Sequence, residues 1–188
     1  MSKQKNSRGF SLLEMMVVVM IMVVIAVVAV PSFIRGVAAI RLRSAASSVS
    51  ALMQEARMLA VRDNAIYGVG FTSSGGTTFV FVDLDRDGAL DANERRNLVS
   101  LPQNITMVAS GAPSITNIGG IANYSPTAAL PSFNARGLPC SGTSPCTNGA
   151  FIYYLQQTRP LDGDAFGAIT ITQAGRIKAY THNGTAWN

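Results

Sequence analysis

The sequence is poor in the residues from which most enzyme active sites are built. Its 188 residues include one histidine, His182, one tryptophan and two cysteines. No Ser/His/Asp, Cys/His or paired-acid arrangement can be argued from the spacing of the other candidates. No glycine-rich loop lies between a strand pattern and a helix pattern, where it could hold a phosphate group. We therefore expect a structural protein and not an enzyme, with no required cofactor.

Charged residues are also few, at 13% of the chain, and the net charge of +5 is misleading. Three of the basic residues, Lys3, Lys5 and Arg8, lie in the first nine positions, which hold no acidic residue. The rest of the chain then has 12 basic and 10 acidic residues, a net charge of +2. A chain so close to neutrality lacks the strongly basic character typical of nucleic-acid-binding proteins.

What the sequence does have is one long hydrophobic segment near its beginning. An uninterrupted apolar run from Met15 to Val30 lies within residues 10–34. As a helix, residues 10–34 would be about 37 Å long, against about 30 Å for the hydrocarbon core of a bilayer. Glu14 lies inside this segment, where an acidic group costs about 2.5–3.5 kcal/mol. The segment is predicted to cross a membrane, and Glu14 is predicted to have a function and a partner there.

A removable secretory signal is a competing interpretation, and the sequence disfavours it. Such a signal has an apolar core of about 7–15 residues, followed by small residues at its cleavage site. Here the apolar run is longer, follows directly on Glu14 and continues past Pro31 into more helix pattern. An ordinary membrane anchor with a stray acidic residue is the other alternative. The basic first nine residues predict a cytoplasmic beginning and a single pass of the membrane, with the C-terminal domain outside.

The two cysteines fit an exported domain. Cys140 and Cys146 bracket a short Ser-Gly-Thr-Ser-Pro loop. An even number of cysteines outside the cytoplasm favours a disulfide. Metal binding by the two thiols is the alternative, but there is no other cysteine and only His182 could complete such a site. We predict a Cys140–Cys146 disulfide.

The helix pattern continues beyond the hydrophobic segment. Pro31 removes one backbone donor and should kink or loosen the helix, and Gly36 adds a second soft point. Residues 35–62 form an amphipathic pattern that Asp63 and Asn64 end. Its apolar stripe is most simply the face that packs on a sheet, and it consists of Leu42, Val49, Leu52, Met53, Ala56, Leu59 and Ala60.

After this helix the periodicity changes to that of strands, and residues 63–188 are predicted to form a β-rich domain. Ser73 to Gly76 favour a hairpin turn, and residues 173–175 favour another. With no βαβ alternation, the expected fold class is α+β, a long N-terminal helix packed on a mostly antiparallel sheet. The predicted strands are 65–72, 77–83, 97–101, 105–109, 150–156, 168–172 and 176–181, with weaker signals at 121–124 and 131–134.

The first residues of the hydrophobic segment carry a resemblance to a known family. Gly9-Phe10-Ser11-Leu12-Leu13-Glu14 resembles the prepilin leader of type IV pilins and of type II secretion pseudopilins. The resemblance implies that residues 1–9 are a leader which prepilin peptidase removes after Gly9. It also implies methylation of Phe10 as the mature N-terminus and a contact of Glu14 with that amino group during filament assembly. The implied structure is the pilin fold, in which residues 10–34 form the transmembrane and filament-core helix.

Three later stretches resemble the GspH/FimT branch of minor pilins. Residues 81–88 are similar to its acidic turn, Ser132–Gly137 to its F-x-x-x-G element, and Thr172–Ile177 to its closing G-R hairpin. The resemblance implies a minor pilin of a type IV pilus that acts in initiation or at the tip of assembly. The implied partners are other major and minor pilins or pseudopilins. The implied location is first the inner membrane, crossed once with the C-terminal domain in the periplasm, and then the pilus or pseudopilus at the cell surface.

One acidic loop matches the calcium-binding template D-x-D-x-D-G-x5-E in full. The matching carboxylates are those of Asp83, Asp85, Asp87 and Glu94, with Gly88 at the sharp turn and Asp91 placed to hold a water ligand. A strand pattern and not a helix pattern precedes this loop, unlike in an EF-hand. The alternative is an Asp/Gly-rich turn whose side chains cap backbone amides. A bound calcium ion would be structural.

The closing hairpin suggests a second candidate ligand. Arg176 and Lys178 would lie on one face of a terminal strand, close to Tyr180 and Trp187. Basic residues beside aromatic residues can neutralise phosphate and stack on bases. DNA-uptake members of the FimT branch bind DNA through a similar G-R-x-R pattern, in which this chain has lysine in place of the second arginine. The alternative is a solvated edge strand whose charges discourage aggregation.

Three hypotheses follow from the sequence. The first is a minor pilin of a type IV pilus, or the corresponding minor pseudopilin of a type II secretion system. The second is a minor pilin that binds DNA in natural transformation. The third is a membrane-anchored periplasmic calcium-binding module unrelated to filaments.

Overall fold

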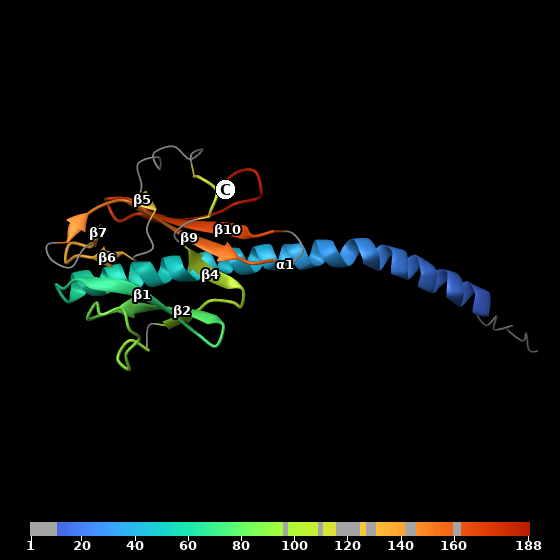
Figure 1. Cartoon of the computed structure of the whole chain (residues 1–188), viewed down its shortest axis with the longest axis horizontal. Coiled ribbons are helices and arrows are strands. Elements are labelled where there is room, and N and C mark those ends of the chain that lie inside the picture. The colour runs from blue at the N-terminus through green and yellow to red at the C-terminus, as the bar shows by residue number, and fades with distance from the viewer. Residues whose placement is uncertain are drawn as a thin grey trace, which may run out of the picture. The chain divides into compact units, whose positions relative to one another are not determined.

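The computed structural model describes residues 11–95, 98–108, 111–115, 125–126, 131–141, 146–159 and 163–188. The chain consists of two compact units, residues 1–38 and residues 39–188. The first unit contains the beginning of the helix α1, and the second contains the rest of α1 and all the strands (Figure 1).

The helix α1 runs from Leu12 to Arg62 and is unbroken at Pro31 and Gly36. The predicted long helix is therefore confirmed. Its end agrees with the prediction too, because Asp63 and Asn64 form a turn and Asn64 has a positive φ of 50°. In the second unit the helix buries one stripe of side chains, as its amphipathic pattern requires. The buried residues of this stripe are Leu42, Ala45, Ala46, Val49, Leu52, Met53, Ala56 and Ala60.

The first sheet has six strands in the order β3-β2-β1-β6-β7-β8, all neighbours antiparallel. The predicted hairpin is confirmed, because β1 and β2 pair from Gly68–Asp83 to Ser74–Thr77, and Gly75 and Gly76 form the turn with positive φ. The strands are β1 (Tyr67–Ser74), β2 (Thr77–Asp83), β3 (Leu98–Ser100), β6 (Ser132–Phe133), β7 (Pro139–Ser141) and β8 (Thr147–Asn148).

The second sheet has the order β11-β10-β9-β4, again antiparallel, with β5 paired parallel to β9. The strands are β4 (Ile105–Val108), β5 (Ser125–Pro126), β9 (Phe151–Gln157), β10 (Ala165–Ile171) and β11 (Ile177–Thr181).

Most of the core lies between α1 and the two sheets. Buried apolar residues of α1, β1, β2, β9 and β10 form one cluster. In Figure 1 the strands β1 and β2 lie on one side of the helix, and β9 and β10 lie on the other. The largest fully buried side chains of this core are Tyr153, Phe133, Met53, Leu101, Ile105, Leu155, Ile169 and Ile171. A smaller cluster on the outer face of the second sheet contains Ile115, Ile152, Tyr154, Ala168 and Trp187.

The structure differs from the sequence expectation in three places. Two sheets are present instead of one, because the strands divide into two hydrogen-bonded sets around α1. The strand β10 begins at Ala165, before the predicted start at residue 168, since Gly167 disguised the alternating pattern. The short strands β5, β7 and β8 were not predicted, because they lie in a region rich in Gly, Pro and Ser. The predicted strand at 121–124 lies outside the described residues.

Candidate functional site

The first unit presents an apolar helix with one carboxylate. Glu14 lies in the first turn of α1 and is exposed. The helix begins after Ser11, whose carbonyl oxygen accepts a hydrogen bond of 3.2 Å from the N–H of Met15. A carboxylate in the first turn interacts favourably with the partial positive charge of the helix N-terminus. The predicted cleavage point Gly9 and the predicted mature N-terminus Phe10 lie outside the described residues.

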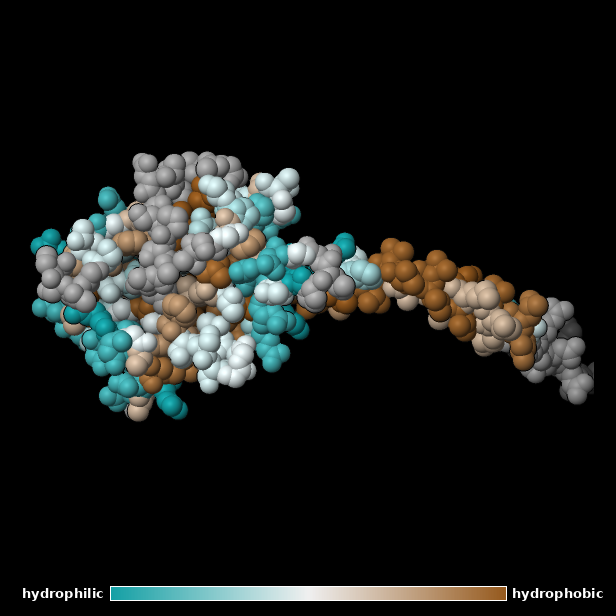
Figure 2. All heavy atoms as spheres, in the orientation of Figure 1, coloured by the Kyte–Doolittle hydropathy of each residue, from teal (hydrophilic) through white to brown (hydrophobic). Residues whose placement is uncertain are grey.

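The apolar side chains of this helix segment have no protein cover in the structure. Its most apolar 18-residue window has a mean hydropathy of 3.0 and none of it is buried. Figure 2 shows apolar residues along the visible face of this segment. A helix that is apolar all round requires lipid or other apolar helices around it. By length and composition α1 is able to cross a membrane.

The acidic loop brings three of its predicted ligands together. Carboxylate oxygens of Asp83, Asp85 and Asp87 lie within 4.8 Å of one another. Asp83 ends β2 and is buried, whereas Asp85 and Asp87 are exposed. The loop is thus entered from a strand, as the sequence predicted. Three converging carboxylates offer the oxygen ligands that a hard cation prefers.

The backbone amides of the same loop also use these carboxylates. Asp83 accepts hydrogen bonds from the N–H groups of Arg86 and Gly88, and the buried Glu94 accepts them from Leu84 and Asp91 at 2.7 and 3.1 Å. Burial raises the pKa of Asp83, although its two backbone donors oppose that rise. Glu94 is therefore directed at backbone amides and does not belong to the converging group of carboxylates. The loop has the hydrogen bonds of the capped turn, and it brings together three of the predicted calcium ligands.

The two cysteines form the predicted disulfide. Cys140 and Cys146 are bonded, with their Cα atoms 5.3 Å apart. Cys140 lies in β7 and is fully buried, and Cys146 directly precedes β8. Because β7 and β8 pair antiparallel, the bond closes the end of their hairpin.

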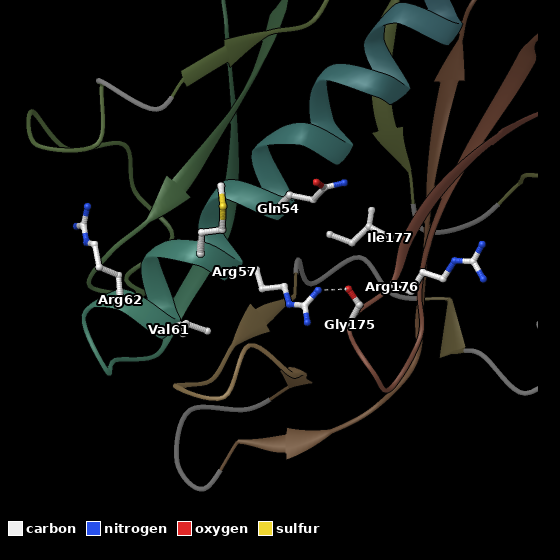
Figure 3. Close-up of a pocket in the computed structure, with 8 residues that line it drawn as sticks. Gln54, Arg57, Val61, Arg62, Gly175, Arg176 and Ile177 are labelled. Carbon is white, nitrogen blue, oxygen red and sulfur yellow. Dashed lines mark hydrogen bonds between the residues drawn. The ribbon is translucent and has the colours of Figure 1, made fainter.

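Gly137 and Gly175, which belong to the two family-like motifs, both pack against Arg57. Arg57 was not predicted from the sequence as a functional residue. Arg57 reaches from α1, and its Nη1 donates a 2.9 Å hydrogen bond to the carbonyl oxygen of Gly175 (Figure 3). A Cβ atom on Gly175 would lie 2.8 Å from the carbonyl oxygen of Gly137, and one on Gly137 would lie 3.0 Å from Nε of Arg57. The F-x-x-x-G element and the closing hairpin are therefore packed together against the helix. Sequence spacing holds no signal for this contact, because the three residues are far apart in the chain.

The closing hairpin places the predicted DNA-binding residues on the surface. Arg176 and Lys178 are both exposed, and Nζ of Lys178 lies 5.1 Å from the ring centroid of Tyr180. Trp187 is instead buried, with its ring 5.9 Å from that of Tyr154 and 5.1 Å from that of His182. Trp187 therefore belongs to the core and is not available to stack on a base.

A long helix, apolar at its beginning and packed further along against antiparallel sheets, defines the class of pilin-like subunits. The family model for the prokaryotic N-terminal methylation motif matches residues 4–30. The family model for the type II transport protein GspH matches residues 45–175. The chain therefore belongs to the GspH family, as a GspH/FimT-like minor pilin or pseudopilin. Searches of curated proteins and of solved structures found no match.

Proposed function

We propose that this protein is a minor structural subunit of a type IV pilus that acts in the initiation of assembly or at the tip. The observation that carries the proposal is the apolar beginning of α1, which has a single carboxylate, Glu14, in its first turn. Such a helix suits two environments in turn, the bilayer and the apolar helix core of a filament. The partners would be other major and minor pilins.

Processing would create the charge partner that Glu14 needs. Cleavage by prepilin peptidase after Gly9 frees the amino group of Phe10, which is then methylated. That amino group, of the same or a neighbouring subunit, lies within one helical turn of Glu14 in sequence. An opposite charge nearby offsets the cost of placing a carboxylate at membrane depth.

The proposal is tested by the N-terminus and mass of the native protein, determined separately in sheared surface filaments and in membranes. We expect methylated Phe10 in the filament fraction. Glu14→Gln keeps the shape of the side chain and removes its charge, so this variant should be processed in the membrane and missing from filaments. Ser11→Ala serves as a control that leaves the charge intact.

Two results would redirect the proposal. Methylated Phe10 confined to membranes, in cells that assemble a secretion complex, would identify a minor pseudopilin of a type II secretion system. An N-terminus at Met1 or Ser2 would exclude processing and leave an anchored periplasmic domain.

A second candidate function is DNA binding in natural transformation. The favouring observation is that Arg176 and Lys178 are both exposed on the closing hairpin. The double variant Arg176→Ala with Lys178→Ala should abolish retardation of DNA by the protein. The matched control is Arg41→Ala with Arg136→Ala, which removes the same charge from two other exposed positions. Equal retardation by both double variants would exclude the hairpin as a DNA site.

For the acidic loop we propose a structural calcium ion. Support comes from the convergence of the carboxylates of Asp83, Asp85 and Asp87. Burial and the neighbouring acidic residues raise the pKa of Asp83, and a bound cation would offset both effects on its charged form. In calorimetry, calcium should bind the wild type and not Asp85→Ala, while the control Asp164→Ala, outside the loop, should bind normally. Heat signals that are equal for all three would show that the carboxylates only cap backbone amides.

A further inference from the structure

The strand β11 forms one edge of the second sheet, and half of its backbone groups point away from the sheet. Thr172 and Arg176 share a hydrogen bond across the β10–β11 pair, and so do Phe166 and His182. Hydrogen-bonded pairs alternate with non-bonded pairs in an antiparallel ladder. The N–H and C=O groups of Ile177, Ala179 and Thr181 are therefore directed outward.

This edge is already closed at both ends by other parts of the chain. Thr181 exchanges two backbone hydrogen bonds, of 2.9 and 3.0 Å, with Asn188. At the other end the carbonyl oxygen of Gly175 accepts the bond from Arg57. Within the described part of the chain, the outward groups of Ile177 and Ala179 have no partner. The open window between Gly175 and Thr181 is about 20 Å long at about 3.3 Å per residue.

Two hollows lie beside this window, between β11 and the helix α1. Their volumes are about 570 and 400 Å³. The side chain of Ile177 packs on the core, which places it on the helix side of the sheet (Figure 3). A strand added beside β11 would therefore cover a stripe of α1 that includes Met58 and Val61, which are 66% and 50% exposed. The second sheet is thus one strand too narrow to cover the helix.

Basic side chains predominate among the charged side chains around the two hollows. The described residues that line them include no Asp or Glu, and their charged members are Arg43, Arg57, Arg62 and Arg176. Arg62 is paired with Asp63 at the rim. Lys178 adds another exposed cation on the opposite face of β11. Complementary charge favours an acidic partner here.

We propose that the β11 edge between Gly175 and Thr181 binds an extended, acidic segment of another protein chain as an additional strand. Unpaired backbone donors and acceptors provide hydrogen bonds to a peptide backbone, and the pockets beside them accept alternate side chains. The apolar stripe of α1 favours aliphatic residues on one face of the segment. Lys178, on the opposite face of β11, favours acidic residues on the other face, and Arg176 adds positive charge at the edge of the hollow. A nucleic acid could use the cations but not the backbone ladder or the apolar stripe. The proposal does not depend on filament assembly.

The test uses the full chain in detergent micelles and the peptide acetyl-Val-Glu-Val-Glu-Val-amide. Amide hydrogen exchange, followed by NMR, should slow at least about tenfold at Ile177 and Ala179 when the peptide binds, because their N–H groups enter a ladder. The same peptide with lysine in place of glutamate should bind more weakly.

Two variants of one residue distinguish binding through backbone hydrogen bonds from nonspecific adsorption of the peptide. Ala179→Pro removes an outward N–H without removing a bond to β10, since proline is tolerated where an edge strand faces outward. Ala179→Val keeps that N–H. The valine variant should bind the peptide like the wild type, and the proline variant should lose binding.

Three results would overturn the proposal. The first is unchanged amide hydrogen exchange at Ile177 and Ala179 of the wild-type protein when the peptide is added. This result does not depend on the folding of any variant. The second is equal peptide binding by the proline and valine variants. The third is binding of a short single-stranded oligonucleotide at this edge with no binding of the peptide, which would assign the site to nucleic acid.

Discussion

At the scale of single residues, Gly137 and Gly175 of the two family-like motifs pack closely against Arg57. Both glycines have positive φ, of 71° and 80°, a backbone conformation that residues with a side chain rarely adopt. A Cβ atom on Gly175 would also overlap the carbonyl oxygen of Gly137, and one on Gly137 would press on the side chains of Arg57 and Val61. Two reasons together therefore explain why these positions hold glycine. The backbone has a positive φ, and neighbouring atoms leave no space for a Cβ atom.

Replacing Gly175 by alanine should be more costly than backbone strain alone predicts. Gly76 has nearly the same φ, 77° against 80°, but open space around it. Gly76→Ala should lower the free energy of unfolding by about 1–2 kcal/mol, the cost of a left-handed non-glycine residue. Gly175→Ala should lower it by about 1–3 kcal/mol more, because its Cβ atom overlaps a backbone oxygen. Denaturant unfolding of both variants measures the difference, and equal losses would disprove the close-packing contribution.

At the scale of elements, the second half of the domain uses short strands that need support. The strands β7 and β8 contain three and two residues, and each is paired over only a few positions. The disulfide joins Cys140 in β7 to Cys146, which directly precedes β8, across a sequence separation of 6. Hydrophobic burial helps at Cys140, which is fully buried.

Removing this disulfide should destabilise the domain without unfolding it. For a loop this short, loop-closure entropy predicts a loss of about 2 kcal/mol in Cys140→Ala with Cys146→Ala. At about 2–4 °C per kcal/mol, the melting temperature should fall by about 4–8 °C. The oxidised wild type treated with a reductant is the matched comparison and should show a similar fall. A double variant that melts like the oxidised wild type would show that the bond is not a stabilising element.

At the scale of the whole molecule, the two units differ in what stabilises them. Every buried core residue in the described part of the chain lies between Leu42 and Trp187, inside the second unit. In the described part of the first unit, residues 11–36 are exposed, and only Val37 and Ala38 are partly buried. Its surroundings must therefore come from lipid or from other subunits, whereas the second unit stabilises itself.

Deleting residues 1–38 should leave the domain folded. Because no core contact is lost, the melting temperature of residues 39–188 should match that of the domain in the full chain in micelles, to within about 2–3 °C. Thermal unfolding followed by circular dichroism makes this comparison. As a positive control, Met53→Ala in the core should lower stability by about 2–5 kcal/mol. A large fall on truncation would show that the first unit supports the domain.

The sequence by itself determined the features that depend on neighbouring residues. The apolar run with Glu14, the helix to Arg62, the turn at Gly75 and Gly76, and the acidic loop can each be read from local periodicity and turn chemistry. The cysteine pair could also be predicted, since a short loop brings Cys140 and Cys146 together.

Only the tertiary structure decided the features that depend on residues far apart in the chain. It divided the strands into two sheets around α1, packed Arg57 against Gly137 and Gly175, and buried Trp187 in the core. It also left the outward groups of Ile177 and Ala179 unpaired beside an uncovered stripe of the helix. The physical reason is that local patterns specify which face of a strand or helix is apolar. Which element covers that face, and which edge stays open, is set by packing energies summed over the whole domain.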